Sequence, residues 1–170
     1  MTAPPRLLVS ACLLGRPVRY DGGHRAFDSA RLADWVAQGR AIGFCPEVAA
    51  GLPTPRAPAE IADGEDGLAV LDGRATIIEP DGRDVTAIYR AGAQAALDFA
   101  RVQECRFALL TDGSPSCGSR FIYDGSFSGT RHDGIGVTTA LIRAHGIAVF
   151  DPSSFDALVA AMEAPTRPSA

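Results

Sequence analysis

Short apolar runs alternate along the chain with longer amphipathic segments, and this alternation predicts strands and helices. Leu7–Val9 is typical of a buried strand, and so is Ala41–Phe44. Between them we predict a helix that Asp28 caps, that runs through Val36 and that Gly39 ends. A strand, a helix and a strand in this order are typical of a βαβ unit, whose strands pair in parallel.

The second half of the chain continues this pattern. A long helix is predicted to begin at its cap, Asp84, and to end near Glu104. The other predictions are strands over Arg106–Leu110 and Ile147–Phe150, a helix over Val137–Ala144 and a last helix that Ser153 caps. The predicted fold class is therefore α/β, a Rossmann-like open parallel sheet flanked by helices.

The region from Pro46 to Asp84 departs from this pattern. Its prolines disfavour regular helix, so most of it reads as a structured loop. Within it, Leu68–Leu71 and Arg74–Ile78 flank Asp72-Gly73, a pair that suits a type I′ turn. We therefore predict a small β-hairpin inserted at the edge of the sheet.

Composition narrows the class of protein. The 170 residues, 46% of them hydrophobic and 21% charged, match a single domain over 1–170, with flexible tails expected at 1–5 and 165–170. All 16 basic residues are arginines that stand singly, and 20 acidic residues outnumber them, so no basic patch for nucleic acid is indicated. No apolar run approaches the ~18–20 residues that span a bilayer. The sequence does not indicate an oligomeric state.

The four cysteines indicate reduced thiols rather than a disulfide framework, because no signal peptide is recognisable and the composition is not that of a small secreted protein. We therefore expect a cytoplasmic protein. Cys12, Cys45 and Cys117 each follow a predicted strand, whereas Cys105 does not and is expected to be a buried apolar residue. Because the carboxyl ends of parallel strands share one crevice, the first group of thiols is expected to meet there.

Zinc, an iron–sulfur cluster and thiol redox chemistry are alternative explanations of such a site. The close cysteine pairs of structural zinc sites and a Cys-x-x-Cys motif are absent, although His24, His132 and His145 are available as further ligands. A cluster held by three cysteines, with one iron free of protein ligands, suits the count best. An open iron is a Lewis acid and favours catalysis, whereas a non-enzymatic iron–sulfur sensor or electron carrier is the alternative function.

Further polar residues lie next to these cysteines. Glu47 comes shortly after Cys45 and is either a general base in the crevice or an ordinary surface or capping glutamate. Ser114 and Ser116 either donate hydrogen bonds to a ligand or cluster, or only shape the turn before Cys117. Arg56 either pairs with an acidic residue such as Glu60 or faces the site, and the sequence does not decide between these.

Several motifs together resemble those of the thiouracil desulfidase family of small bacterial proteins. They include Ser10-Ala11-Cys12-Leu13-Leu14-Gly15, Cys45-Pro46-Glu47-Val48 and Ser114-Pro115-Ser116-Cys117-Gly118, and the likeness extends from about Leu7 to Phe150. The resemblance implies a [4Fe–4S] cluster with three cysteine ligands, Cys12, Cys45 and Cys117, and one open iron. It also implies an enzyme that removes sulfur from thiolated uracil without redox chemistry.

The same resemblance implies Glu47 and Ser114 as an acid/base pair. On this hypothesis the thione sulfur binds the open iron, a water activated by Glu47 attacks the thiocarbonyl carbon, and Ser114 relays a proton or hydrogen-bonds the ring. The products are uracil and sulfide, and no electron donor is needed. A small thiolated nucleobase is thus the expected partner, rather than nucleic acid or a membrane.

Overall fold

The computed structural model describes residues 3–165, so the tail residues 1–2 and 166–170 lie outside the described part of the chain. The strands are β1 (Arg6–Ser10), β2 (Ala41–Phe44), β3 (Glu60–Ile61), β4 (Ile77–Ile78), β5 (Cys105–Leu109), β6 (Phe121–Tyr123), β7 (Arg131–Asp133) and β8 (Ala148–Phe150). The α-helices are α1 (Ala30–Ala37), α2 (Pro46–Ala49), α3 (Gly67–Leu71), α4 (Thr86–Val102), α5 (Val137–Ala144) and α6 (Phe155–Glu163). Short 3-10 turns are η1 (Ala11–Leu14), η2 (Ala62–Gly64) and η3 (Pro152–Ser154).

The central sheet has four strands in the order β2-β1-β5-β8, and all of them pair in parallel. After β1 the chain crosses to β2 on one side, whereas after β5 it crosses to β8 on the other. The connections that leave β1 and β5 therefore diverge at the carboxyl ends of these strands, which is where open α/β sheets bind ligands. The predicted open parallel sheet with flanking helices is confirmed.

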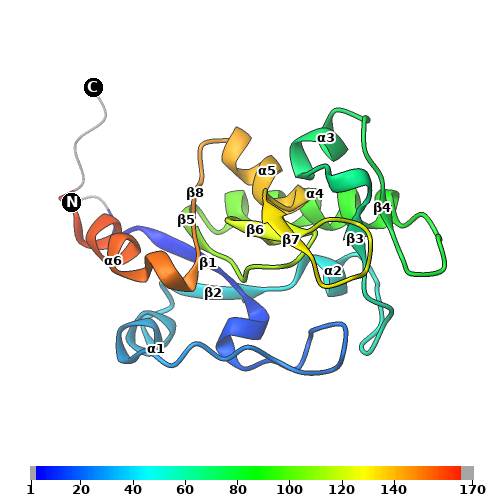
Figure 1. Ribbon diagram of the computed structural model, residues 1–170. Helices are drawn as coiled ribbons and strands as arrows, with labels where there is room; N and C mark the ends of the chain where they lie inside the picture. Colours follow the sequence, from blue (N-terminus) through cyan, green and yellow to red (C-terminus); the bar gives the residue numbers. More distant parts are fainter. Residues whose placement is uncertain (1–2, 166–170) are drawn as a thin grey trace.

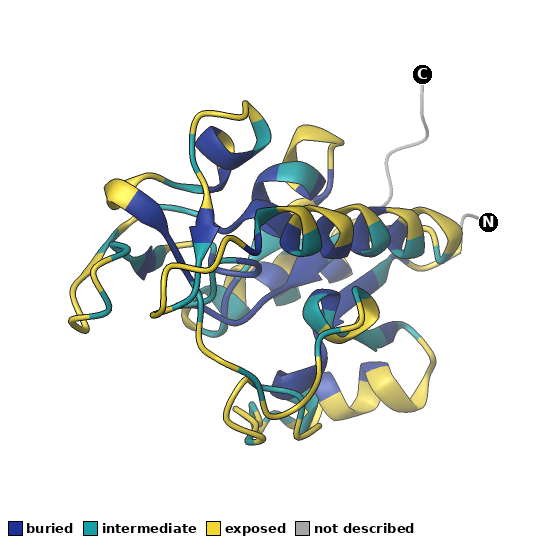
Figure 2. Cartoon of the chain, turned by 90° about the vertical axis from the view of Figure 1, so that its right-hand side faces the viewer, coloured by how far each residue is buried: buried dark blue, intermediate teal, exposed yellow. Residues whose placement is uncertain are grey.

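Helices cover both faces of this sheet (Figure 1). Leu7 of β1 packs with Trp35 of α1 and with α6 on one face, whereas Leu8 packs with Leu97 of α4 and Ile142 of α5 on the other. This division follows from the alternation of side chains along a strand. The longest helix, α4, is buried on the side that faces the sheet and exposed on the opposite side (Figure 2).

The predicted hairpin over Leu68–Leu71 and Arg74–Ile78 is wrong. Leu68–Leu71 belongs to the helix α3, because Asp66 caps it by accepting hydrogen bonds from the backbone N–H groups of Leu68 (3.0 Å) and Ala69 (3.4 Å). A run of four apolar residues suits a strand or a helix, and here the cap decides. The strand β4 pairs instead with β3 in an antiparallel two-stranded sheet.

Three predicted helix caps are displaced by one or two residues, and at α4 the cap is Val85 rather than Asp84. Ser29, rather than Asp28, caps α1, with its hydroxyl accepting a hydrogen bond from a backbone N–H in the first turn. At the end of the chain, Asp151 rather than Ser153 forms a capping box with Ser154 around η3, which leads into α6. All three helices lie where the hydrophobic pattern predicts them.

The segment between α2 and α4 is more regular than predicted and forms one wall of the crevice. It contains β3, α3 and β4, and a second antiparallel pair, β6 and β7, lies beside it. A third core cluster joins both small sheets to α4 and α5, through Ile61, Ile77, Tyr89, Ile122 and Val137. Within residues 3–165, no helix is both long and apolar enough to cross a membrane.

Candidate active site

A cavity of about 360 Å³ opens at the carboxyl ends of the parallel strands. Cys12 lines it from η1, directly after β1, and Cys45 lines it from the position between β2 and α2. Cys117 lines it from the loop after β5. The structure thus brings together the thiols that were expected to meet, at the point where the connections from β1 and β5 diverge.

The surroundings of the Cys12 thiol combine burial with positive charge. Burial raises the pKa of this thiol, and the neighbouring Cys45 adds to the increase. Arg19, the Thr111 hydroxyl and Arg25 lower the same pKa. Burial therefore favours the neutral thiol in the metal-free protein, while the site holds the cationic and hydrogen-bonding groups that stabilise a metal-bound thiolate.

Polar groups also oppose the effect of burial on the pKa values of the other two thiols in the cavity. Burial raises the pKa of the Cys45 thiol, and the backbone N–H groups of Val48 and Glu47, in α2, lower it. Burial likewise raises the pKa of Cys117, and the Ser10 hydroxyl lowers it. The Cys117 thiol itself donates to the Ser116 hydroxyl at 3.8 Å. Donors to ligand sulfur are a common means of stabilising iron–sulfur sites.

The chemistry of this donor set fits an iron–sulfur cluster. Within residues 3–165, no group of three or more His, Cys, Asp or Glu side chains is arranged to hold a single metal ion. The cavity lining includes none of the three described histidines. Thiols that line one cavity without forming a single-ion site, each beside polar groups that lower its pKa, fit a cluster in which each thiolate binds a different iron.

Glu47 lies in the first turn of α2 and lines the same cavity. Its side chain is only 13% exposed and forms an ion pair with Arg56, which is 6% exposed. Arg56 therefore pairs with Glu47 rather than with Glu60, the acidic partner suggested as an example from the sequence. A buried carboxylate is costly unless it is paired and hydrogen-bonded, and Arg56 meets both requirements.

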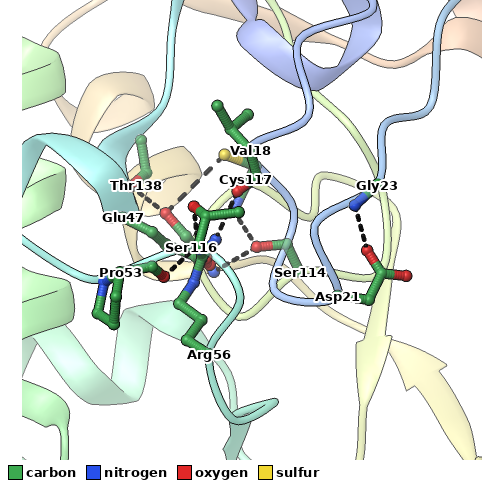
Figure 3. Close-up of polar contacts among 11 residues, drawn as sticks. Val18, Asp21, Gly23, Glu47, Pro53, Arg56, Ser114, Ser116, Cys117 and Thr138 are labelled. Carbon is green, nitrogen blue, oxygen red and sulfur yellow. Dashed lines mark hydrogen bonds and ion pairs between the residues drawn. The ribbon is translucent and has the colours of Figure 1, made fainter.

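The Arg56 guanidinium uses its N–H groups to connect Glu47 to the loops that contain Val18 and Pro53 (Figure 3). It donates through Nε to Glu47 Oε2 (2.9 Å) and through Nη2 to the Val18 carbonyl (2.9 Å). Through Nη1 it donates to the Pro53 carbonyl (3.1 Å) and to the Thr54 hydroxyl (3.2 Å). Arg56 thereby fixes the carboxylate relative to the loops that contain Val18 and Pro53.

Tyr89 approaches Glu47 from α4. The approach depends on Gly92, because a Cβ at that position would lie 2.5 Å from the Pro46 carbonyl oxygen of α2. Burial, followed by the nearby Glu47 charge, raises the pKa of Tyr89, so its hydroxyl stays protonated. In the sequence Tyr89 was only part of the apolar stripe of a helix, and no signal there indicated its place in the cavity.

Ser114 shapes the turn that presents Cys117 (Figure 3). Its Oγ accepts hydrogen bonds from the backbone N–H groups of Ser116 (3.0 Å) and Cys117 (3.1 Å). Ser114 also lines the cavity, and its hydroxyl donates no hydrogen bond to another described residue. The turn-shaping alternative is therefore observed, and the hydroxyl proton remains available for a ligand.

The first turn of α5 holds the Cys117 loop from behind. The backbone N–H groups at a helix start lack partners within the helix, and here those of residues 136–138 donate to carbonyl groups of residues 115–118 at 2.8–2.9 Å. The Ser116 hydroxyl, which is buried, shares a hydrogen bond of 2.8 Å with the Thr138 hydroxyl. Gly136 permits this contact, because a Cβ there would lie 2.4 Å from the Ser116 carbonyl.

The cavity also has an aromatic lining that the sequence did not reveal. Flat aromatic rings stack well on heterocyclic bases. The aromatic residues that line the cavity are Tyr20, Phe44, Tyr89, Tyr123 and Phe127. They come from separate loops, strands and helices, so only the folded chain brings them to one cavity.

Cys105 lies apart from this site, as the sequence suggested. It is the first residue of β5, is 7% exposed and packs in the core cluster beneath α4 and α5. Burial raises the pKa of its thiol to about 11, against a lowering effect of Arg6. Cys105 does not line the cavity and serves as an apolar core residue.

Comparison with known proteins shows the same family along nearly the whole chain. The family described as 2-thiouracil desulfurase matches residues 7–153. The uncharacterized protein YbbK of Bacillus subtilis (strain 168) is 42% identical over 150 residues, which cover 88% of this chain and 97% of YbbK. The solved structure of the [4Fe–4S]-dependent thiouracil desulfidase TudS is 48% identical, with a TM-score of 0.84 and coverage of 93% of this chain and 97% of its own. The chain therefore belongs to the 2-thiouracil desulfurase family and is an enzyme of that family, as its motifs indicated.

Proposed function

We propose that this protein removes the sulfur atom of thiouracil by hydrolysis, with a [4Fe–4S] cluster held by Cys12, Cys45 and Cys117. The observation that carries the proposal is the convergence of these thiols on one cavity that also contains the buried carboxylate of Glu47. The likeness to TudS, a [4Fe–4S]-dependent thiouracil desulfidase, supports the same cofactor and substrate class here.

The overall reaction exchanges sulfur for oxygen and needs no oxidant or reductant. The oxygen of water bonds to the thiocarbonyl carbon, the carbon–sulfur bond breaks, and the sulfur leaves as hydrosulfide while the ring becomes uracil. When bound, the cluster supplies a Lewis-acidic iron with affinity for soft sulfur, which makes the thiocarbonyl carbon easier to attack. The protein must supply the proton transfers and hold the ring.

Glu47 is the proposed general base, and it takes a proton from the attacking water. Arg56 holds this carboxylate by Oε2, so its position relative to the cavity is fixed before the substrate arrives. Ser114 is the proposed second member of the acid/base pair, and it relays a proton or hydrogen-bonds the ring. The turn in which Ser114 accepts hydrogen bonds from the backbone leaves its hydroxyl proton free for this role.

The size and lining of the cavity support a single base as the substrate. Small-molecule sites commonly occupy about 300–1,000 Å³, and a cavity of about 360 Å³ lies at the small end of that range. Rings such as Phe44 and Phe127 supply flat apolar surface for a heterocycle. The free thiols need a reducing compartment, which supports a cytoplasmic location.

The test is an assay of sulfide release from 2-thiouracil and 4-thiouracil by protein reconstituted without oxygen. We expect the wild type to convert at least one of these substrates to uracil and sulfide, in the absence of any electron donor. The variant Glu47→Gln should keep its iron and acid-labile sulfide but lose activity by about 10²–10⁴-fold. Glu65→Gln, a substitution at an exposed glutamate outside the cavity, is the matched control and should remain active.

Two results would contradict the proposal. Protein that contains the cluster but releases no sulfide would be an iron–sulfur sensor or electron carrier instead of a desulfidase. Full activity of Glu47→Gln would remove Glu47 from the role of base, while leaving the desulfidase activity itself intact.

A further inference from the structure

Glu60 is a buried carboxylate that none of the steps above uses. It is the first residue of β3, is 8% exposed and lines the cavity. Its Oε2 accepts a hydrogen bond of 2.8 Å from the backbone N–H of Phe127. Within residues 3–165, Oε1 has no hydrogen-bond partner and the carboxylate forms no ion pair, because Arg56 is committed to Glu47.

Within the described residues, the only fully buried side-chain polar atoms without a partner are Ser119 Oγ and His132 Nε2, so Glu60 Oε1 is open to the cavity. Removing water from this oxygen without replacing the hydrogen bond is unfavourable, by an amount comparable to a lost hydrogen bond or more. A ligand that displaces water from Glu60 Oε1 must therefore present a hydrogen-bond donor. The oxygen and sulfur atoms of a thiopyrimidine are acceptors, so its ring N–H groups are the donors that a carboxylate can bind. A site built in this way rejects analogues that lack the donor, because the carboxylate oxygen then loses water without gaining a partner.

The hydrogen bond from Phe127 connects this carboxylate to the aromatic wall of the cavity. Phe127 has a positive φ of 54°, which is rare for a bulky residue and is tolerated only where the surroundings hold it. Its N–H is held by Glu60 and its side chain lines the cavity. One oxygen of Glu60 thus fixes the position of Phe127, and the other is left for a ligand beside it.

We propose that Glu60 is a specificity-determining residue that accepts a hydrogen bond from a ring N–H of the thiopyrimidine, next to the ring of Phe127. This inference rests on the proposed function, because it concerns the same cavity and the same substrate class. It adds a recognition role for the ring edge, which is distinct from the chemistry at the thiocarbonyl carbon.

The test measures binding of uracil, 1-methyluracil and 3-methyluracil to the cluster-containing protein by calorimetry, so that it does not depend on turnover. The decisive variant is Glu60→Gln. Its amide oxygen still accepts the Phe127 N–H, whereas its amide NH₂ replaces the free acceptor with a donor. Glu65→Gln is the matched control, and the melting temperature of each variant reports whether the fold is retained.

We expect the wild type to bind one methylated ring about ten- to one-hundred-fold more weakly than uracil. In Glu60→Gln, uracil should bind more weakly by a similar factor, and the discrimination against that methylated ring should disappear. For 2-thiouracil turnover, the same variant should show a raised KM with little change in kcat, since the bond is made in the ground state as well as in the transition state.

Several outcomes would overturn this inference. If the wild-type protein binds no uracil, or binds all of these rings equally, no carboxylate accepts a hydrogen bond from a ring N–H. This result is obtained without any variant. Discrimination that persists unchanged in Glu60→Gln reflects crowding by the methyl group instead. A further outcome separates the two proposals: if the wild type releases no sulfide but the binding pattern is as expected, the proposed function fails and the recognition role of Glu60 is retained.

Discussion

Arg56 directs both Nε and Nη2 to a single oxygen of Glu47, Oε2, and donates nothing to Oε1. Its remaining N–H groups bind the Val18 and Pro53 carbonyls and the Thr54 hydroxyl. One side chain therefore sets the orientation of the carboxylate and connects it to both neighbouring loops. Such a planar fork of donors cannot be reproduced by the point charge of a lysine.

Replacing Arg56 should affect stability and activity together. Arg56→Ala leaves the buried Glu47 carboxylate without its partner, and the free energy of unfolding should fall by about 3–5 kcal/mol. Arg56→Lys keeps a positive charge but loses most of the hydrogen bonds. The rate of sulfide release should therefore fall clearly, while the free energy of unfolding should fall less than in Arg56→Ala. Urea unfolding and the sulfide assay on the same samples measure the two effects.

The control for this prediction is Arg74→Ala. The Arg74 side chain is 59% exposed and pairs with Asp72 on the surface at 3.2 Å. Such pairs contribute about 0–1 kcal/mol, so the control should change neither stability nor rate appreciably. Equal behaviour of the Arg56 and Arg74 variants would show that the buried pair does not position Glu47.

The four cysteine-to-alanine variants should fall into two groups by their iron content after reconstitution. We expect Cys12→Ala, Cys45→Ala and Cys117→Ala each to lose most of the iron and the broad visible absorbance, because each removes one proposed ligand. Cys105→Ala should retain both, since Cys105 lies in the core cluster away from the cavity. If Cys105→Ala folds normally but loses the cluster, Cys105 is a cluster ligand and its assignment as a core residue is wrong.

A methyl group at Gly136 should damage the site without touching the cavity. The new Cβ would lie 2.4 Å from the Ser116 carbonyl, and relieving this contact pushes the Cys117 loop away from α5. Gly136→Ala should therefore lose at least about 1–3 kcal/mol of stability and bind less iron. Gly134→Ala, whose Cβ meets only side-chain atoms at 3.2 Å or more, is the control and should be close to wild type in both measurements.

The buried Cys105 thiol should make stability depend on alkaline pH. Its pKa is raised from 9.0 to about 11, so between these values the unfolded chain has lost a proton that the folded chain keeps. Stability from this group is therefore complete below pH 9 and declines as pH rises toward 11. Urea unfolding should show a steeper decline over this window in the wild type than in Cys105→Ala, and parallel curves would contradict the raised pKa.

The sequence predicts the parts of this protein that depend on periodicity and on parallel topology. Apolar runs such as Leu7–Val9 locate the strands, and the rule that their carboxyl ends share a crevice is enough to bring Cys12, Cys45 and Cys117 together. The sequence also predicts that Glu47 lies in the crevice, because it comes two residues after Cys45. These inferences need only the order of elements along the chain.

The remaining site residues depend on tertiary contacts that no local pattern encodes. Glu60 reaches the cavity because β3 pairs with β4, and that pairing was hidden by the wrong hairpin prediction at Leu68–Leu71. Tyr89 reaches Glu47 because Gly92 lets α4 approach α2. Apolar spacing locates helix α4 but does not reveal which of its residues will face a ligand.

The divergence of the connections after β1 and β5 has a consequence for how the protein matures. The proposed ligands come from loops near the start, the first third and the last third of the sequence, and they become neighbours only when β1, β2 and β5 have paired. Contacts between such distant segments require closure of long loops, which makes them slow to form. On the proposed ligation, cluster insertion therefore requires β1, β2 and β5 to pair first, and a chain that stops short of the Cys117 loop should retain little iron.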